Sequence, residues 1–414
     1  MTPTRRGLLL AHPLPSDAVP RPVSRYAFAL LAYAFAVIML GTTVPTPLYA
    51  LYADRMDFAV LTTTIIYAAY AGGVLAALLV FGRWSDAVGR RPMLLAGVVS
   101  AIASAVVFLV ADSVGALVVA RVLSGLSAGL FTGTGTAAII EAAPQHWRSR
   151  ATAVATVANI GGLGAGPLLA GILVQYAPQP LHLVFAVHIA MAALAGIAVL
   201  VVPETSPRSG RIGLQRLSVP AEARSVFVIA GLAAFAGFAV TGLFTAVAPS
   251  FLEEVLGIGH HAVAGAVVCT IFAASAVTQV AANRIPPPRA VAVGCAILVA
   301  GMTVLAVALQ FSSLPGLIAA AVIAGIGQGM SFSRGLAAVS ERTPPERRAE
   351  VSSTYFVVAY VAISLPVIGE GLAAQTFGLQ TAGVCFAIAV AVLAAICLAA
   401  ILIRGRGHSR NRAA

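Results

Sequence analysis

The chain has 414 residues, of which 60% are hydrophobic and only 9% are charged. Soluble domains are about half apolar and about a quarter charged, so this composition excludes a soluble globular protein and indicates a membrane protein. The formal net charge is +11, and all 25 basic residues are arginines.

Twelve apolar runs follow one another along the chain, and each is long enough to cross a bilayer, which takes ~20 residues of helix. They are too long for the strands of a membrane barrel, which span ~9–11 residues. Backbone groups inside a membrane need internal partners, so the runs are expected to be helices. The sequence predicts an all-α membrane protein with spans at 26–50, 60–81, 93–111, 114–140, 151–176, 181–202, 224–250, 262–282, 290–310, 314–338, 351–375 and 380–403.

The arginines are distributed unevenly between the two sides of this arrangement. Both tails and the loops on their side hold 22 arginines, whereas the opposite loops hold only Arg55, and Arg121 and Arg334 lie inside spans. Basic loops face the cytoplasm, so both termini are predicted to be cytoplasmic. The positive charge therefore reports orientation in the membrane and does not indicate a nucleic-acid partner.

The two halves of the sequence resemble each other. A shift of 200 residues places Gly125 on Gly325 and superposes Glu141, Pro144 and Arg148 on Glu341, Pro344 and Arg348. Such an offset predicts two pseudo-symmetric six-helix bundles that are parallel repeats. The expected parts are a cytosolic tail (1–24), an N-terminal bundle (25–202), a cytosolic linker (203–223), a C-terminal bundle (224–403) and a cytosolic C-terminal tail (404–414).

The loop from Gly82 to Pro92 carries the most specific motif, G-x-x-x-D-x-x-G-R-R-P. It resembles the cytoplasmic loop signature of the major facilitator superfamily (MFS) of secondary transporters. In that family the acid braces the two halves by capping a helix of the other repeat, here near Ser352 and Ser353. The resemblance implies a conformational latch, and the alternative is a loop or solvated rim that only fixes topology. The latch would comprise Gly82, Asp86, Gly89, Arg90, Arg91, Glu141, Arg148, Glu341 and Arg348.

Three ionisable residues are candidates for coupling transport to an ion gradient: Arg121, Glu370 and Asp54. Arg121 precedes Gly125 and Gly129 in a pattern that resembles the family's R-x-x-x-G-x-G motif, which implies a role in proton coupling. Because a charged arginine inside a membrane is costly, it should face a watery cavity, find a partner, or snorkel to the outer surface. Glu370 is the only acid inside a predicted span and Asp54 follows the first span; either could titrate, or both could be rim groups satisfied by water.

The fifth span resembles the glycine-rich signature of exchangers in the superfamily through Gly162, Gly166, Pro167 and Gly171. Ala153 and Ala170 replace two glycines of that signature, so the match is partial. A Gly-Pro step kinks a helix and would let it close against the eighth or eleventh span. The segment from Gly41 to Pro47 resembles, more weakly, a proline signature of twelve-span exporters. Both patterns favour antiport over uptake.

Candidates for a substrate cavity are polar and aromatic residues on the spans that line it in this fold. They predict a mostly apolar pocket with few hydrogen-bonding groups, although each singly could be a packing residue. The candidates are Tyr33, Met39, Tyr67, Tyr70, Asn159, Phe235, Phe238, Gln328, Phe332 and Tyr355.

These features together predict a secondary active transporter that works by alternating access. The expected function is proton-coupled efflux of small apolar or amphipathic compounds, such as drugs or natural products. The alternatives are an uptake permease for a polar metabolite and, from another class, a membrane-embedded enzyme or sensor. No clustered Ser/His, paired Asp or His-rich ligand sets are visible at helical spacing, so we expect no enzyme and no metal.

No phosphate-binding loop of the GxxxxGK[ST] type occurs, so we expect no ATP and no cofactor, with the proton gradient as the energy source. The expected partners are a small-molecule substrate and the lipid bilayer. The resemblance implies a monomer in the cell (inner) membrane.

Overall fold

The structure is a computed structural model that describes residues 25–413, except for the side chains of 148, 149 and 405–413. Within this range, twelve helices are long and apolar enough to cross a membrane, which confirms the predicted spans to within a few residues at most ends. The predicted N-terminal tail, 1–24, lies outside the described residues.

The N-terminal bundle is built from the first nine helices. Its first span is interrupted, because α1 ends before Pro45 and the chain continues through a short 3₁₀ turn (Thr46–Leu48) into α2. The fifth span begins as α7, passes through one π-helical turn (Val157–Gly161) and continues as α8. The helices are α1 (Arg25–Thr43), α2 (Tyr49–Met56), α3 (Val60–Phe81), α4 (Trp84–Ala87), α5 (Arg90–Leu109), α6 (Val114–Ala142), α7 (Arg148–Thr156), α8 (Gly162–Tyr176) and α9 (Pro180–Val201).

The C-terminal bundle repeats this plan with eight helices. The predicted C-terminal tail starts at 404, where the candidate span ends, but the helix itself continues to Ala413. The helices are α10 (Ala221–Ala246), α11 (Ala248–Glu254), α12 (His261–Ala281), α13 (Pro287–Gln310), α14 (Leu314–Glu341), α15 (Arg348–Ala362), α16 (Leu365–Phe377) and α17 (Leu379–Ala413).

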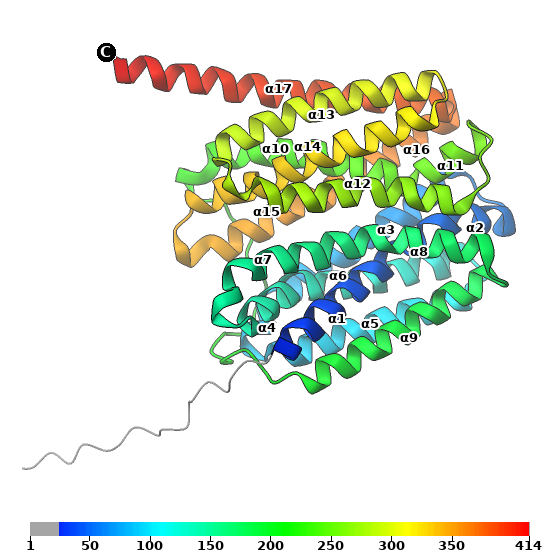
Figure 1. Ribbon diagram of the computed structural model, residues 1–414, viewed down its shortest axis with the longest axis horizontal. Helices are drawn as coiled ribbons and strands as arrows, with labels where there is room; N and C mark the ends of the chain where they lie inside the picture. The colour runs from blue at the N-terminus through cyan, green and yellow to red at the C-terminus, as the bar shows by residue number, and fades with distance from the viewer. Residues whose placement is uncertain (1–24, 414) are drawn as a thin grey trace, which may run out of the picture.

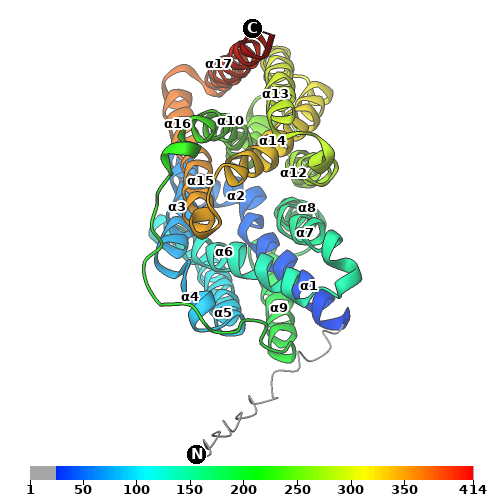
Figure 2. The same cartoon turned by 90° about the vertical axis from the view of Figure 1, so that its left-hand side faces the viewer.

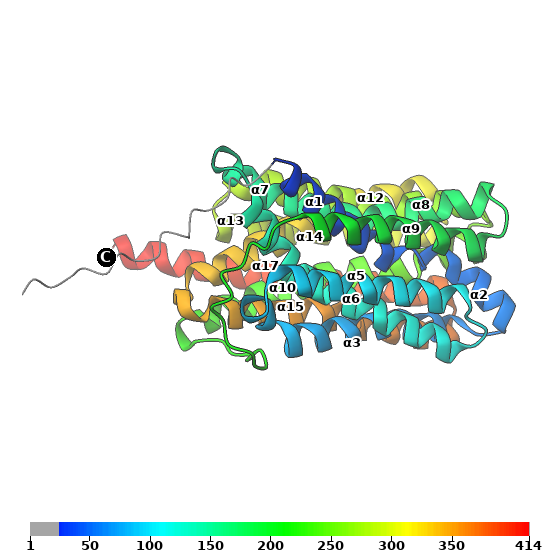
Figure 3. The same ribbon diagram turned by 90° about the horizontal axis from the view of Figure 1, so that it is seen from below.

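The two bundles lie side by side, as Figure 1 shows, and their long helices run in the same general direction, which Figure 3 also shows. We call the end that carries α4 and the Gly82–Pro92 loop the loop end, and the opposite end, with α2 and α11, the far end. The start of α1 and the end of α17 both lie toward the loop end (Figure 1). Segment 203–220, between α9 and α10, contains no helix and runs along one side of the loop end from one bundle to the other (Figure 2).

The 200-residue repeat is visible in the details of the helices. Ser113 and Ser313 cap α6 and α14 in the same way, since each hydroxyl accepts a hydrogen bond from the backbone N–H three residues later. Side-chain oxygens at this position satisfy backbone donors that a helix start leaves unpaired. Further along, α7 and α15 begin at Arg148 and Arg348, again 200 residues apart.

Glycines bring neighbouring helices into close contact in both bundles. A Cβ on Gly125 of α6 would lie 2.9 Å from the backbone nitrogen of Val74 and 3.0 Å from the Cα of Gly73, both on α3. The equivalent Gly325 of α14 would meet Ala274 of α12 at 2.9 Å. Small residues allow membrane helices to approach closely, so these positions fix the packing of the fourth and tenth spans.

We predict that Gly125→Leu lowers the melting midpoint of the purified protein in detergent, because the larger side chain forces α6 away from α3. Overpacking of this kind costs about 1–3 kcal/mol. The matched control is Gly115→Leu on the same helix, where a Cβ meets nothing within 4 Å. Equal midpoints for both variants would contradict the assigned packing.

Candidate functional site

A central cavity of about 40 Å³ lies between the two bundles. Both halves line it, as expected for a site that two rocking halves share. The lining residues are Thr42, Thr43, Tyr67, Tyr70, Arg121, Ile160 and Leu163 from the N-terminal bundle and Phe238, Thr241, Phe272, Ser275, Gln328, Tyr360 and Ile363 from the C-terminal bundle.

Arg121 is the charged residue of this cavity, and its side chain is only 1% exposed. One terminal nitrogen, Nη1, donates a hydrogen bond of 2.5 Å to the carbonyl of Thr42. The guanidinium carbon lies 4.9, 5.4 and 6.0 Å from the ring centroids of Tyr70, Tyr67 and Tyr49, within the range of cation–π attraction. The Nε atom has no hydrogen-bond partner among the described residues.

The break in the first span explains why the carbonyl of Thr42 is available. Pro45 and Pro47 lack the backbone N–H groups that would bond the carbonyls of Gly41 and Thr43, and α1 ends at Thr43, so the regular i+4 bonding does not continue past Thr42. The Thr42 carbonyl accepts from Arg121 instead. The segment that resembles an exporter signature therefore supplies one direct contact to the buried charge.

A short polar network from the C-terminal bundle forms the other wall of the cavity. The hydroxyl of Ser275 donates to Gln328 Oε1 at 2.5 Å and accepts from the side chain of Gln279 at 3.0 Å. Gln328 is held against Gly237 of α10, and the ring of Phe238 stands edge-to-face with Phe332 at 4.8 Å. This wall therefore combines the amide of Gln328 and the hydroxyls of Thr241, Ser275 and Tyr360 with aromatic surface.

Four of the ten predicted cavity residues line the central cavity: Tyr67, Tyr70, Phe238 and Gln328. The other six are not among its lining residues. Tyr33 lines a separate apolar groove between α1, α7, α8 and α9, and Met39 is buried inside the N-terminal bundle. Asn159 lies in the π-helical turn, Phe235 is partly buried on α10, and Phe332 and Tyr355 belong to an aromatic cluster within the C-terminal bundle.

The three coupling candidates lie in different places. Arg121 lines the central cavity, whereas Asp54 is exposed on α2 at the far end. Glu370 is buried in a small apolar pocket inside the C-terminal bundle, lined by residues such as Leu243, Leu309 and Leu379. Neither carboxyl oxygen of Glu370 has a hydrogen-bond partner among the described residues.

At the loop end, Arg90 is the centre of an ion-pair cluster. Its guanidinium lies 2.6 Å from Asp86 and forms a two-pronged contact with Glu141 at 2.9 and 3.3 Å. It also donates to the hydroxyl of Ser85 at 2.7 Å. Glu141, a member of the predicted latch, thus pairs with the arginine loop, and the cluster joins α4, α5 and α6 of one bundle.

Asp86 does not cap the eleventh span in this structure. A cavity of about 300 Å³ separates the bundles at the loop end, and Asp86, Ser352 and Ser353 all line it. The nearby segment 203–220 occupies the space beside α4, where the N–H of Gly210 donates to the carbonyl of Asp86 at 3.0 Å. The acid is therefore engaged within its own bundle, and the brace between the halves is open.

The second repeat lacks an equivalent cluster among the described side chains. Glu341 is exposed and forms no ion pair there, and Arg348 donates only a long hydrogen bond of 3.4 Å to the carbonyl of Thr343. Arg148 begins α7, but its side chain lies outside the described part of the chain. Only the first repeat therefore shows a charged cluster built around the loop.

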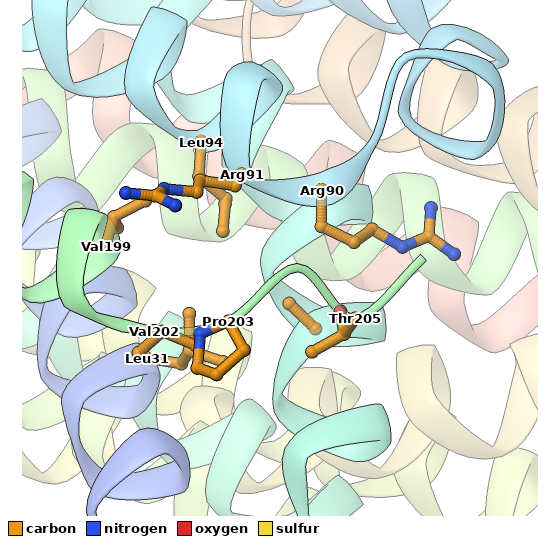
Figure 4. A pocket seen from close by; sticks show the side chains of 9 residues that line it. Leu31, Arg90, Arg91, Leu94, Val199, Val202, Pro203 and Thr205 are labelled. Carbon is orange, nitrogen blue, oxygen red and sulfur yellow. The ribbon is translucent and has the colours of Figure 1, made fainter. Parts of the chain in front are cut away.

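Sequence reasoning missed Glu204, which caps the start of α5. Its carboxylate accepts hydrogen bonds from the backbone N–H groups of Arg90 at 2.8 Å and Arg91 at 3.1 Å. Gly89 adopts a φ of 119°, and a Cβ there would collide with this carboxylate, so the motif glycine is required for the close approach. Figure 4 shows Arg90 and Arg91 pointing away from each other above Pro203 and Thr205.

The surroundings of Glu204 also set its charge. Burial opposes ionisation and by itself would raise the pKa of Glu204. Hydrogen bonds outweigh this effect and hold the pKa below its usual 4.5, together with a nearby positive charge; the donors are the backbone N–H groups of Ser206, Arg90 and Arg91, and the charge is the Arg208 guanidinium. The hydroxyl of Thr205 donates to Glu141 at 2.7 Å, so the linker also joins the ion-pair cluster. The cluster thus extends from the loop into the connection between the two bundles.

The glycines of the antiporter-like motif hold the fifth span against two neighbours. Gly162 and Gly166 face the backbone of α1, and Gly171 faces His261 and Ala262 of α12. On the opposing helix, Gly265 contacts Pro167 and Leu168 of α8. The motif therefore lies where the fifth and eighth spans meet, the first of the two contacts expected from the sequence.

The amino-acid sequence matches the Major Facilitator Superfamily over residues 28–367 and 282–414. The chain belongs to this family. The family and its twelve-helix fold are those of membrane transporters and not of enzymes.

Several curated members of the Major Facilitator Superfamily are similar to parts of the chain. The uncharacterized MFS-type transporter YtbD of Bacillus subtilis is 30% identical over 147 residues, which is 34% of this chain and 37% of YtbD. The putative multidrug resistance protein MdtD of Klebsiella pneumoniae is 26% identical over 176 residues, 42% of this chain and 37% of MdtD. The multidrug transporter MdfA of Yersinia pestis is 29% identical over 207 residues, 50% of this chain and 49% of MdfA. The chain thus spans less than half the length of each of these relatives.

Two solved structures from the superfamily share the fold over nearly the whole chain. The human organic anion transporter MFSD10 (TETRAN) has a TM-score of 0.66 at 18% identity and covers 90% of this chain and 99% of its own. The second is a bacterial homolog of the human lysosomal transporter Spinster, in an inward-facing and unoccupied conformation. It has a TM-score of 0.72 at 16% identity, and the match covers 92% of this chain and 97% of the homolog. At these identities the likeness establishes the fold alone.

We predict that Glu204→Gln destabilises the protein at pH 7 and has a smaller effect near pH 4. At pH 7 the wild-type carboxylate is charged and contributes fully to the cap of α5. As the pH falls through the lowered pKa of Glu204, the wild-type side chain is protonated and this contribution is lost. Thermal unfolding in detergent at both pH values measures the difference.

The matched control is Glu222→Gln, which removes an exposed acid from the first turn of α10. The account expects it to leave the melting midpoint close to that of the wild type. If Glu204→Gln lowers the melting midpoint as much at pH 4 as at pH 7, the charge of the Glu204 side chain does not contribute to the stability of the cap.

Proposed function

We propose that this protein is a secondary active transporter that works by alternating access in the cell membrane, with the loop end in the cytoplasm. It exports small apolar or amphipathic compounds in exchange for protons. The observation that carries the proposal is a small central cavity, shared by both bundles, with unequal contact between the bundles on its two sides.

The far end is closed by close helix contacts between the bundles. The backbone N–H of His261 on α12 donates to the side chain of Gln175 on α8 at 3.0 Å. Gly371 of α16 approaches α3 so closely that a Cβ there would lie 3.2 Å from the Cα of Leu61. These contacts hold the two bundles together at this end.

The loop end is more open, because the cavity of about 300 Å³ lies between the bundles there. Tyr70 of α3 and Tyr360 of α15 line the central cavity, and their ring centroids are 6.3 Å apart. Phe356, one turn before Tyr360, lines the loop-end cavity. Movement of this tyrosine pair would connect the central cavity with the loop end.

Export is supported by the composition of the site and by the fifth span. Most residues around the central cavity are apolar or aromatic, which suits amphipathic compounds better than strongly polar metabolites. Within the antiporter-like motif, Gly171 faces α12, and Pro167 meets Gly265 of that helix. Two of the partly similar relatives are named as multidrug proteins, which agrees with this direction of transport.

Glu370 is the candidate proton carrier. An isolated carboxylate without hydrogen-bond partners is far more costly in an apolar pocket than the neutral acid. Release of a proton from Glu370 would therefore require α16 and its neighbours to rearrange, and this requirement can link proton transfer to a change of conformation. The arrangement supports proton coupling through the C-terminal bundle.

We predict that acid-loaded proteoliposomes become more alkaline inside when a substrate is added outside. The test uses naphthalene-2-sulfonate and naphthalene-2-sulfonamide as probes, a pH dye in the lumen, and valinomycin with potassium on both sides to clamp the membrane potential. Exchange carries the probe inward and protons outward, whereas an uptake symporter would acidify the lumen. Failure of both probes to change the lumenal pH would contradict the proposed function.

Glu370→Gln should abolish the change in lumenal pH, because the amide cannot carry a proton. The control is Glu253→Gln, which removes an exposed acid at the same end of the molecule. Probe binding by both purified variants serves as the check on folding. Full proton exchange by a folded Glu370→Gln variant would exclude Glu370 as the carrier.

A further inference from the structure

The charge of Arg121 is not balanced by any side chain around it. Its cavity contains no aspartate or glutamate among the described residues that line it. Glu370, the acid that is buried among the described residues, occupies a different pocket that does not share a lining residue with this cavity. The guanidinium is therefore a buried cation that has no counter-ion among the described residues around it.

Such a charge is costly to maintain. Arginine stays protonated in proteins, so it cannot escape the cost by losing its proton. Placing an arginine at the centre of a membrane helix costs about 2.5–3.5 kcal/mol on insertion scales. One carbonyl and three tyrosine rings offset part of this cost, and an anion in the cavity would offset more.

The guanidinium also has donor capacity left for such an anion. Its Nε is buried and has no partner, while Nη1 is bound to Thr42. Arginine binds planar or tetrahedral oxyanions through two parallel N–H groups, which gives both affinity and orientation. The donor set that remains on Arg121 is suited to one carboxylate, sulfonate or phosphate oxygen pair.

The volumes of the central and loop-end cavities favour an amphipathic anion over a small inorganic one. The central cavity of about 40 Å³ has room for a charged group but not for a drug-sized body. The loop-end cavity of about 300 Å³ is lined by apolar residues such as Leu78, Phe81 and Phe356 and also by polar and charged ones, among them Asp86 and Arg90. If movement of Tyr70 and Tyr360 joins the two cavities, an aromatic body fits in the larger one while its anionic group reaches Arg121.

We propose that the transported compounds are organic anions, and that Arg121 binds their anionic group. This inference rests on the proposed transport function and narrows its substrate class. The compound carries one carboxylate, sulfonate or phosphate on an apolar or aromatic body. It supplies the negative charge that the cavity lacks, and Gln328 and Ser275 face it from the other bundle.

The first test needs no variant. Binding of naphthalene-2-sulfonate, naphthalene-2-sulfonamide and 2-naphthyltrimethylammonium to the purified wild-type protein is measured by calorimetry in detergent. These probes share one aromatic body and differ in charge. The sulfonate should bind about tenfold or more tightly than the sulfonamide, which corresponds to about 1.4 kcal/mol. Equal or tighter binding of the neutral or cationic probe would overturn the inference.

The second test assigns the preference to Arg121. Arg121→Gln should remove the difference between sulfonate and sulfonamide, and Arg121→Lys should keep part of it, because it retains the charge without the planar fork. Arg150→Gln, which removes an exposed arginine from α7, is the matched control and should bind as the wild type does. A sulfonate preference that persists in a folded Arg121→Gln variant would also overturn the inference.

Failure of this inference can be told apart from failure of the proposed function. If both probes drive proton exchange equally well in vesicles, the anion preference is refuted and the transport proposal stands. If neither probe moves protons but the sulfonate binds in an Arg121-dependent way, the binding site is upheld and the transport proposal is refuted.

Discussion

The burial of the Arg121 guanidinium between the two bundles is the constraint on which the site depends. A permanent charge at this depth must be satisfied by groups that the fold brings to it. The break of the first span at Pro45 frees the carbonyl of Thr42, and α3 contributes two of the three tyrosine rings around the charge. Close packing of α6 on α3 through Gly125 keeps these groups within reach. Gly125 and the prolines at the break of the first span thus serve one electrostatic requirement.

The C-terminal bundle forms the opposite wall of the central cavity. The contact between the two bundles differs between the far end and the loop end. Glycine-mediated contacts close the far end, whereas a cavity separates the bundles at the loop end. The charged cluster around Arg90 lies wholly on one side of that cavity and is tied by Glu204 to the segment that connects the bundles. Packed interfaces tend to have discrete arrangements. A charged cluster that does not bridge the bundles at the loop end, together with tight contacts between them at the far end, fits one of the two states of a carrier whose halves rock.

Much of the fold could be predicted from the sequence because span length, arginine placement and the 200-residue repeat each depend on strong physical rules. The site was harder to predict. A membrane helix is apolar both on the side that faces lipid and on the side that packs inside the bundle, so the hydrophobic pattern of the sequence does not show which side faces a cavity. Tyr355 and Tyr360 illustrate this. The first donates to backbone carbonyls inside the C-terminal bundle, while the second, five residues later, lines the central cavity. Glu204 was missed because its role depends on the path of a segment without regular structure.

The most direct test of the account is the distance between the bundles at both ends, measured by electron spin resonance on spin-labelled cysteines in a background without the native ones. One pair, Ala137→Cys with Ala349→Cys, lies across the loop-end cavity, and the other, Asp112→Cys with Glu253→Cys, spans the far end. Alternating access predicts that a change of pH together with naphthalene-2-sulfonate shortens the first distance and lengthens the second. Distances that stay unchanged, or that change in the same direction at both ends, would contradict it.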